Sequence, residues 1–394
     1  MVPKRVHCIG EARAQYGDLA DRLVSFLDHS DVLADRVVEA LEEMPRKEGH
    51  LLLNRMLEEG RSSTPEAPEA LHELIKAVEH VPLWVNWERI ERGRKLLFRA
   101  GLLGGLVLGA KSLVHGYCAP AGNKPLVFTG RLKSKAARRI NETARFVQAV
   151  CLPGGMRRNG EGFAITVKVR LMHAQVRKLL LQSGKWREDL WSLPINQHDM
   201  LATNLLFSSV WLNGLRLFGF QLTPEESEDY MHLWRYVGYV MGVDPELLPS
   251  SEAEAIHLQE LILLTQGPPD EDSKSLVYAL LDAPLERARD EKEREQIAKR
   301  VQFSRYLCRW LIGDDIADQL GLPRKRTAEW GLLAFRRVVH RADGFRTRVP
   351  FIPEMVRRAG ERYWVWLVEQ GLKGTPADFQ RPDSLDPAFV GSSA

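Results

Sequence analysis

Apolar residues recur at helical spacing along almost the whole chain, and this pattern limits the possible folds more than any other feature of the sequence. Leu19, Leu23 and Leu27 form one such stretch near the N-terminus. Spacings of three and four residues bring side chains to one face of an α-helix. Strand-like alternation occurs only around residues 163–169 and continues into helical spacing, so we expect a helix there too. The sequence therefore predicts an all-α fold, a single domain with peripheral helices.

Turns and changes in composition divide the chain into four parts. We expect residues 1–81 to form an N-terminal helical extension that packs on a central core of residues 82–265. Residues 266–372 should add C-terminal helices to the same domain. Residues 373–394 are rich in Pro, Asp, Ser and Gly, so they are predicted to form a flexible tail with little to bury.

Three local patterns predict where helices start and where the surface lies. Residues 63–66 have the composition of a helix start, with Ser63 and Glu66 at the spacing of a capping box. Residues 222–225, with the order Leu-Thr-Pro-Glu, predict another helix start. Residues 266–273 are rich in Pro and Asp and predict a charged, exposed loop.

The most apolar stretch covers residues 100–114, which is shorter than a bilayer requires. Gly101, Gly105 and Gly109 lie on one face of it, which favours close packing against another helix or a porphyrin over a membrane dimer. The N-terminus has a basic start without the apolar region of a secretory signal. We therefore expect no stable membrane span and a cytoplasmic location.

The charge balance and the cysteines argue against several classes of function. The formal net charge is only +3, from 55 basic and 52 acidic residues, so no electrostatic footprint for nucleic acid is present. The four cysteines form no C-x-x-C pair, which argues against a zinc ribbon and against disulfide exchange. The C-x-x-C-H motif is also absent, so any haem would be held non-covalently. The sequence does not indicate an oligomeric state.

His173 lies in a helical stretch, residues 167–181, whose inner face is apolar. Val169, Val176 and Leu180 share that face, so the imidazole is expected to point inward. A neutral imidazole in an apolar pocket suits the axial ligand of a haem iron. The same pattern also describes a hydrogen-bonded core histidine.

Arg170 and Arg177 lie about one turn on either side of His173. Either guanidinium could pair with a haem propionate, because arginine binds carboxylates through two parallel hydrogen bonds. Surface salt bridges are the usual role of arginines at such positions and remain the alternative.

The preceding helix, predicted over residues 131–150, carries Thr143 on its apolar stripe and Arg139 one turn upstream. The hydroxyl of Thr143 then faces the core and needs a partner. A structural alternative is available, because the hydroxyl can bond to the carbonyl one turn back and Arg139 can pair with a nearby acid.

Residues 139–143, Arg-Ile-Asn-Glu-Thr, are followed thirty residues later by His173, and together they resemble the haem signature of latex-clearing proteins. The wider group is the MpaB-type oxygenases. The order and spacing of several stretches carry the resemblance, which covers residues 82–249 well. The further similar stretches are residues 126–132, 194–199 and 230–238.

The resemblance implies a globin-like helical core that holds a non-covalent haem b, with His173 as the proximal ligand. It places Arg139 and Thr143 in the pocket across the porphyrin, where Thr143 could donate a hydrogen bond toward bound oxygen. Arg139, Arg170 and Arg177 are the candidates for haem contacts. The expected reaction is the cleavage by O2 of a C=C bond in an isoprenoid or other apolar alkene, for which the haem supplies the oxygen chemistry.

Glu142 departs from the family pattern. Latex-clearing proteins carry a lysine here that can cap the distal face of the iron, and a carboxylate cannot replace a neutral amine ligand. Glu142 is therefore a candidate catalytic base, or a partner of Arg138 or Arg145. The departure leaves a second function open, that of a non-catalytic carrier or sensor of haem or a hydrophobic ligand on the same fold.

A competing metal site would use two Glu-x-x-His pairs, Glu69 with His72 and Glu254 with His257, at the spacing found in di-iron bundles. Both pairs lie outside the central periodic helices. With eleven histidines in the chain such matches arise by chance, and the haem hypothesis is preferred.

Overall fold

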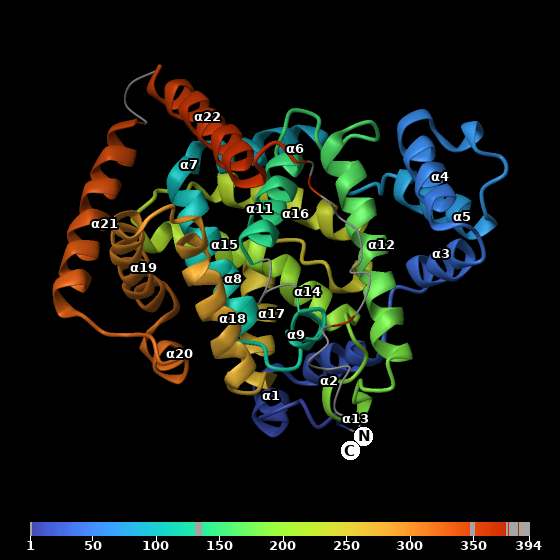
Figure 1. The fold of residues 1–394 in the computed structure, drawn as a ribbon, viewed down its shortest axis with the longest axis horizontal. Helices are drawn as coiled ribbons and strands as arrows, with labels where there is room; N and C mark the ends of the chain where they lie inside the picture. The colour runs from blue at the N-terminus through green and yellow to red at the C-terminus, as the bar shows by residue number, and fades with distance from the viewer. Residues whose placement is uncertain (1, 131–135, 347–350, 376, 378–384, 386–394) are drawn as a thin grey trace.

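The computed structural model describes all residues except 1, 131–135, 347–350, 376, 378–384 and 386–394 (Figure 1). Helices make up the regular structure of the described part, and its only extended pairing is an antiparallel bridge between Val6 and Gln266. The all-α prediction is confirmed. It includes the strand-like residues 163–169, which lie inside a helix of 22 residues.

The described helices follow one another with short connections. The N-terminal group comprises α1 (Ile9–Tyr16), α2 (Asp18–Ser25), η1 (Phe26–Asp28), α3 (Val32–Glu42), α4 (Arg46–Glu59), η2 (Arg61–Ser63) and α5 (Glu69–Glu79). The middle group comprises α6 (Trp87–Gly93), α7 (Lys95–Val107), η3 (Leu108–Ser112), α8 (Leu113–Tyr117), α9 (Lys124–Phe128), α11 (Ala136–Val150), α12 (Glu161–Gln182), α13 (Glu188–Trp191), α14 (Gln197–Phe207), α15 (Ser209–Leu217), α16 (Pro224–Met241), η4 (Pro245–Leu247) and α17 (Glu252–Thr265). The C-terminal group comprises α18 (Glu271–Asp282), η5 (Ala283–Arg287), α19 (Glu291–Ile312), α20 (Asp314–Gln319), α21 (Arg326–Arg346) and α22 (Ile352–Leu372).

Helices α11, α12, α14 and α16 form the centre of the molecule, and α12 packs against both α11 and α16 (Figure 1). The start of α16 is set by local chemistry. The Thr223 hydroxyl accepts the backbone N–H of Glu226, the Glu226 side chain accepts that of Thr223, and Pro224 occupies the first turn. The helix start predicted at residues 222–225 is therefore confirmed.

Ion pairs hold the N-terminal helices to α12, and buried arginines of α12 make two of them. Arg170 of α12 donates to both carboxylate oxygens of Asp31, at 2.6 and 2.8 Å, and both side chains are buried. Two turns further along α12, Arg177 pairs with Asp35 of α3. Gly242 has a φ of 87° and leaves room for the Asp31–Arg170 pair, since a Cβ there would lie 2.3 Å from a carboxylate oxygen of Asp31. A buried pair of this kind is costly to break from one side, because the remaining charge has no partner.

The apolar segment from Trp87 to Tyr117 passes through the interior. It is the one described helical run that is long and apolar enough to cross a membrane by length and composition, yet 67% of its apolar window is buried inside the protein. Such burial is typical of a core helix. Gly101 kinks α7 with a φ of 49°, and its Cα face approaches Gly360 of α22. The predicted close helix packing is confirmed at Gly101 and at Gly105, where a Cβ would lie 2.9 Å from the hydroxyl of Tyr363 on α22. At Gly109 a Cβ would have no atom within 4 Å.

Three local predictions need correction. The helix predicted to start at residues 63–66 begins at Glu69 instead, because residues 61–63 form a separate short helix. Residues 266–273 are only partly an exposed loop, since Asp270 caps α18 and pairs with Lys124. The tail was predicted to have little to bury. Most of it lies outside the described residues, but Leu385 is buried in an apolar cluster with Phe128, Val176, Leu180 and Trp186.

Candidate active site

A cavity of about 300 Å³ lies between α8, α9, α11, α12, α14 and α16. Most of its walls are apolar, which makes it suited to an apolar ligand. Its volume is at the lower end of the usual range for ligand pockets, roughly 300–1,000 Å³. The cavity is lined by all three residues that the resemblance places around a haem, namely His173 from α12 and Arg139 and Thr143 from α11. Glu142 lines it as well.

His173 sits in the wall of this cavity as an uncharged base. Burial, with smaller contributions from the cations of Arg177 and Arg139, lowers the pKa of the imidazole to about 4, although the carboxylate of Asp31 acts in the opposite direction. The ring is therefore neutral at neutral pH. Its Nδ1 is buried and has no hydrogen-bond partner, while the residue as a whole stays partly accessible because it borders the cavity. An unsatisfied buried nitrogen costs about 1–3 kcal/mol, and such groups in native proteins often have a binding or redox role.

The hydroxyl of Thr143 forms the hydrogen bond within its own helix that the sequence offered as the structural alternative. It donates to the backbone carbonyl of Arg139 at 3.0 Å, one turn back in α11. The oxygen still borders the cavity and keeps lone pairs that can accept a hydrogen bond. To donate toward a ligand, the hydroxyl would have to give up the bond to the carbonyl.

Glu142 accepts a hydrogen bond from Nε of Arg138 at 3.0 Å, one turn earlier on α11. The alternative partner, Arg145, donates instead to Gln148 and pairs with Glu161. Glu142 also borders the cavity, where 14% of its side chain is accessible. The carboxylate is thus positioned between an exposed cation and the apolar space.

Arg170 and Arg177 do not line the cavity, contrary to their prediction as haem contacts. Arg170 is bound by Asp31 and by the carbonyl of Val240 on the other side of α12. Arg177 donates to the carbonyls of Pro194 and Ile195 and pairs with Asp35. Both arginines lie on the predicted helix. Their guanidinium groups, however, are paired with Asp31 before α3 and with Asp35 on α3.

Arg177 acts on the cavity indirectly, through Ile195. Ile195 borders the cavity and has a φ of 53°, which is rare for a β-branched residue. Such a conformation costs on the order of 1–3 kcal/mol and persists only where the surroundings impose it. Here the two hydrogen bonds from Arg177, at 3.2 and 2.8 Å, hold the loop in place.

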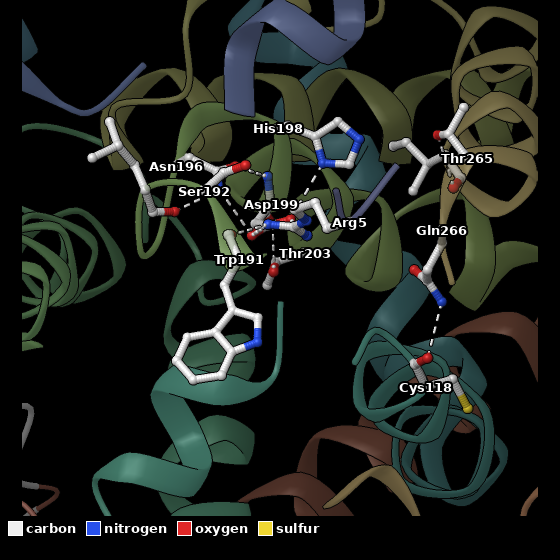
Figure 2. A network of polar contacts seen from close by, with 12 residues as sticks. Arg5, Cys118, Trp191, Ser192, Asn196, His198, Asp199, Thr203, Thr265 and Gln266 are labelled. Atoms are coloured by element: carbon white, nitrogen blue, oxygen red, sulfur yellow. Dashed lines mark hydrogen bonds and ion pairs between the residues drawn. The ribbon is translucent and has the colours of Figure 1, made fainter. Parts of the chain in front are cut away.

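Asp199 is a polar residue of the cavity wall that we did not predict from the sequence. Two nitrogens of the Arg5 guanidinium donate to the two carboxylate oxygens of Asp199, at 2.9 and 2.7 Å. Figure 2 shows this pair beside His198 and Asn196. Burial alone would raise the pKa of Asp199, but Arg5 and His198 lower it well below its usual range. The carboxylate is therefore ionised and paired. Arg5 also donates to the carbonyl of Trp191, so it ties the N-terminal segment to α13 and α14.

A larger cavity of about 710 Å³ lies on the outer side of α12, toward α3 and α4. Its lining includes five charged side chains, Glu42, Glu58, Arg145, Glu161 and Lys168. A site with so many charges does not suit an apolar ligand. We therefore assign the candidate site to the smaller, apolar cavity.

The described residues contain no group of three or more His, Cys, Asp or Glu side chains able to hold a metal ion. The two Glu-x-x-His pairs, Glu69 with His72 and Glu254 with His257, lie on α5 and α17, and neither pair borders the cavity. The described part of the chain gives the di-iron hypothesis no ligand set. A single imidazole remains as the metal-binding candidate.

Comparisons with known proteins agree with this location. The family model described as "ER-bound oxygenase mpaB/B'/Rubber oxygenase, catalytic domain" matches residues 87–342, which include every cavity-lining helix named above. A rubber oxygenase from Streptomyces sp. (strain K30) is 26% identical over 284 residues, which cover 68% of this chain and 66% of that protein. The chain thus spans just under two thirds of the length of this relative.

The solved structure of latex clearing protein LCP in the closed state is similar in fold. It aligns with a TM-score of 0.62 at 21% sequence identity and covers 86% of this chain and 91% of that chain. At this identity the likeness concerns the fold alone. It covers a larger share of the chain than residues 87–342, so it includes residues outside that range.

Proposed function

The chain belongs to the family of oxygenase catalytic domains that includes mpaB/B′ and the rubber oxygenases, and from this premise we propose that it is a haem b-dependent oxygenase. Its substrate in this proposal is an isoprenoid or other apolar alkene, cleaved at a C=C bond by O2. The observation that carries the proposal is the apolar cavity with the neutral, unpaired imidazole of His173 in its wall.

The cavity residues fit a non-covalent haem in their chemistry. His173 offers a neutral imidazole, the ligand form that iron requires. Arg139 contributes a cation to the cavity lining, which suits a propionate carboxylate. Arg170 and Arg177 are no longer part of the proposed haem contacts, because Asp31 and Asp35 already bind them. Their proposed role is to hold α12, and with it His173, against the N-terminal helices.

The bound haem would supply O2 binding and the oxidation of the substrate, and the protein would supply ligation, orientation and the exclusion of water. The overall reaction balances without an external reductant, since one alkene and one O2 give two carbonyl groups. Phe146, Phe207 and Val237 offer the apolar wall against which a hydrocarbon would pack. Thr143 and Glu142 are the polar groups available beside it, the first as a hydrogen-bonding hydroxyl and the second as a candidate base held by Arg138.

One observation favours the second function, that of a carrier or sensor without turnover. The hydroxyl of Thr143 and the carboxylate of Glu142 are both engaged within α11, with Arg139 and Arg138 respectively. Neither group is therefore free for catalysis unless it exchanges its partner. A carrier would need only the apolar cavity and His173.

Absorption spectra of the purified chain, oxidised and reduced, test the cofactor. We expect a Soret band and, after extraction into alkaline pyridine, the spectrum of haem b. A protein that stays colourless after expression with ample haem would contradict the proposal.

Oxygen uptake separates the enzyme from the carrier. The haem-loaded protein is given squalene as an isoprenoid probe under labelled O2, and the carbonyl products are reduced at once with borohydride to alcohols, which keep the carbonyl oxygen atoms. We expect one O2 consumed for each bond cleaved, with label in both carbonyl groups. A stable oxygen complex that decays at the same rate with and without the alkene would favour the carrier.

A further inference from the structure

Exposed apolar side chains gather on the last two described helices and on the residue before α22. Of the nineteen large apolar residues that are exposed in the described part of the chain, nine lie between residues 330 and 366. Scattered exposed apolar residues are normal, but a concentration of this kind marks an interaction surface. In Figure 1, α21 and α22 lie at the outer edge of the molecule, beyond α19 and α7.

Helix α21 is apolar on two opposite faces. Its inner face carries the buried Leu332, and the buried Asp343 pairs there with Arg99. Its outer face carries Trp330, Val338 and Phe345, which are 69%, 63% and 57% exposed. Residues seven or eight apart lie on the same side of a helix, so these three form one stripe. The inner face accounts for the packing of the helix, and the outer stripe is left without a described partner.

The same outer face carries unpaired positive charge. Arg337 and Arg341 lie beside the stripe, are exposed, and have no acidic partner among the residues that the structure describes. Both acids of α21 are already engaged, Glu329 with an arginine before the helix and Asp343 on the inner side. The outer face is therefore apolar and basic at once.

Helix α22 has a similar apolar face, on which the exposed Glu369 accompanies an arginine. Met355 and Trp366 are 68% and 56% exposed, and Arg362 lies between them at seven and four residues, on the same side of the helix. The opposite side is buried through Gly360 and Trp364. We call the outer sides of these two helices the α21–α22 face. It consists of five apolar residues and three arginines: Trp330, Val338, Phe345, Met355, Trp366, Arg337, Arg341 and Arg362.

We propose that the α21–α22 face binds the surface of an anionic lipid membrane. Tryptophan and phenylalanine enter the headgroup region readily, and arginine pairs with lipid phosphates while its aliphatic part stays among apolar groups. The helices would lie in the interface, because the arginines on them forbid a spanning orientation. The inference does not depend on the proposed function.

A second copy of the chain suits this face less well. A twofold interface that pairs α21 with α21 would bring Arg337 and Arg341 close to the same two arginines of the other copy. Like charges in contact are destabilising. A membrane rich in acidic lipids offers the opposite charge over an extended area.

Flotation of the full-length protein with lipid vesicles tests the proposal. We expect binding to phosphatidylcholine vesicles that contain phosphatidylserine, weaker binding as salt is raised, and little binding to phosphatidylcholine alone. Arg337→Glu combined with Arg341→Glu should weaken binding by about thirtyfold or more, at about fivefold for each lost arginine. Trp330→Ser combined with Phe345→Ser should weaken it by about tenfold or more.

Leu51→Ser combined with Leu83→Ser serves as the matched control, because both residues are at least as exposed as Trp330 but lie far along the chain from α21. This variant should bind like the unmodified protein. Thermal unfolding of each variant checks that folding is retained. Equal binding by all variants, or no binding to the acidic vesicles at low salt, would overturn the proposal. Self-association in sedimentation that the Trp330 and Phe345 changes abolish would assign the face to a second copy and overturn it as well.

Discussion

At the scale of single residues, the candidate site combines a buried nitrogen that has no hydrogen-bond partner with two side chains that bond within their own helix. Nδ1 of His173 is buried without a partner, whereas Thr143 and Glu142 each bond to a group one turn back in α11. A buried nitrogen without a partner lowers the stability of the folded protein. A hydroxyl or carboxylate that bonds to a group one turn back in its own helix has little effect on stability. The imidazole is therefore the residue for which binding offers the clearest physical explanation.

His173→Ala should give a folded protein that no longer holds haem, because no other described imidazole lines the cavity. Added imidazole should restore part of the Soret band by filling the space that the side chain leaves. His80→Ala, a change at an exposed histidine, is the control and should bind haem normally. An unchanged spectrum for the His173 variant would remove it as the ligand.

Thr143→Val keeps the shape of the side chain and removes only the hydroxyl. If Thr143 hydrogen-bonds to reacting oxygen, oxygen consumption with squalene should fall about tenfold or more while haem content stays the same. Thr143→Ser should retain most of the rate. Equal rates for the valine and serine variants would make Thr143 a structural residue that only bonds to the Arg139 carbonyl.

At the scale of helices, the closest contact lies between α7 and α22. A Cβ built on Gly360 would lie 1.7 Å from the carbonyl oxygen of Phe98, so only glycine permits the two helices to approach this closely. The kink at Gly101 lies at the same crossing. Helix α22 also contacts α11, so this crossing supports the helix that carries Thr143 and Glu142.

Gly360→Ala should lower the free energy of unfolding by about 3 kcal/mol or more, because backbone atoms must move to admit the methyl group. Gly331→Ala in α21 is the matched control, since nothing lies within 4 Å of its position. That change should stabilise the protein by about 0.5–1 kcal/mol, through the better helix propensity of alanine. Urea unfolding measures both. A neutral result at Gly360 would mean that α22 does not pack on α7 as described.

At the scale of the whole molecule, two histidines outside the cavity are buried in the neutral form. Nε2 of His232 accepts the backbone N–H of Asn86 at 2.9 Å, which only a neutral ring can do. Burial, with the cations of Arg89 and Arg235, lowers its pKa to about 4. Burial also lowers the pKa of His115 to about 3, with a further contribution from Lys111.

The unfolded chain binds protons at these histidines near pH 6.5, and the folded chain does not until about pH 4. Stability should therefore be full above pH 6.5 and fall as the pH is lowered, by about 1–2 kcal/mol for each histidine between pH 7 and pH 5. Urea unfolding at several pH values measures this. His232→Gln keeps an acceptor for the N–H of Asn86 and should reduce the pH dependence. The same slope in both proteins would contradict the assignment.

Several features followed from the sequence by itself. Spacing at three and four residues predicted the helices, and the inward direction of His173, because the helix period alone decides which side chains share a face. The helix start predicted at residues 222–225 is likewise local chemistry, which the structure realises as a capping box of Thr223 with Glu226. The motif around Arg139 and His173 was enough to indicate the oxygenase family, which the comparisons confirm.

Only the tertiary structure decided what those inward side chains meet. Arg170 was placed correctly on its helix, but its partner Asp31 lies 139 positions away, and Arg5 reaches Asp199 across 194 positions. The strained Ile195 and the outward stripe of α21 were equally hidden from local patterns. Helix periodicity fixes a direction within one element, whereas pairing and exposure depend on which other element packs there. Packing between distant segments therefore decides that Arg170 and Arg177 pair with acids of other segments and that Arg139 lines the cavity.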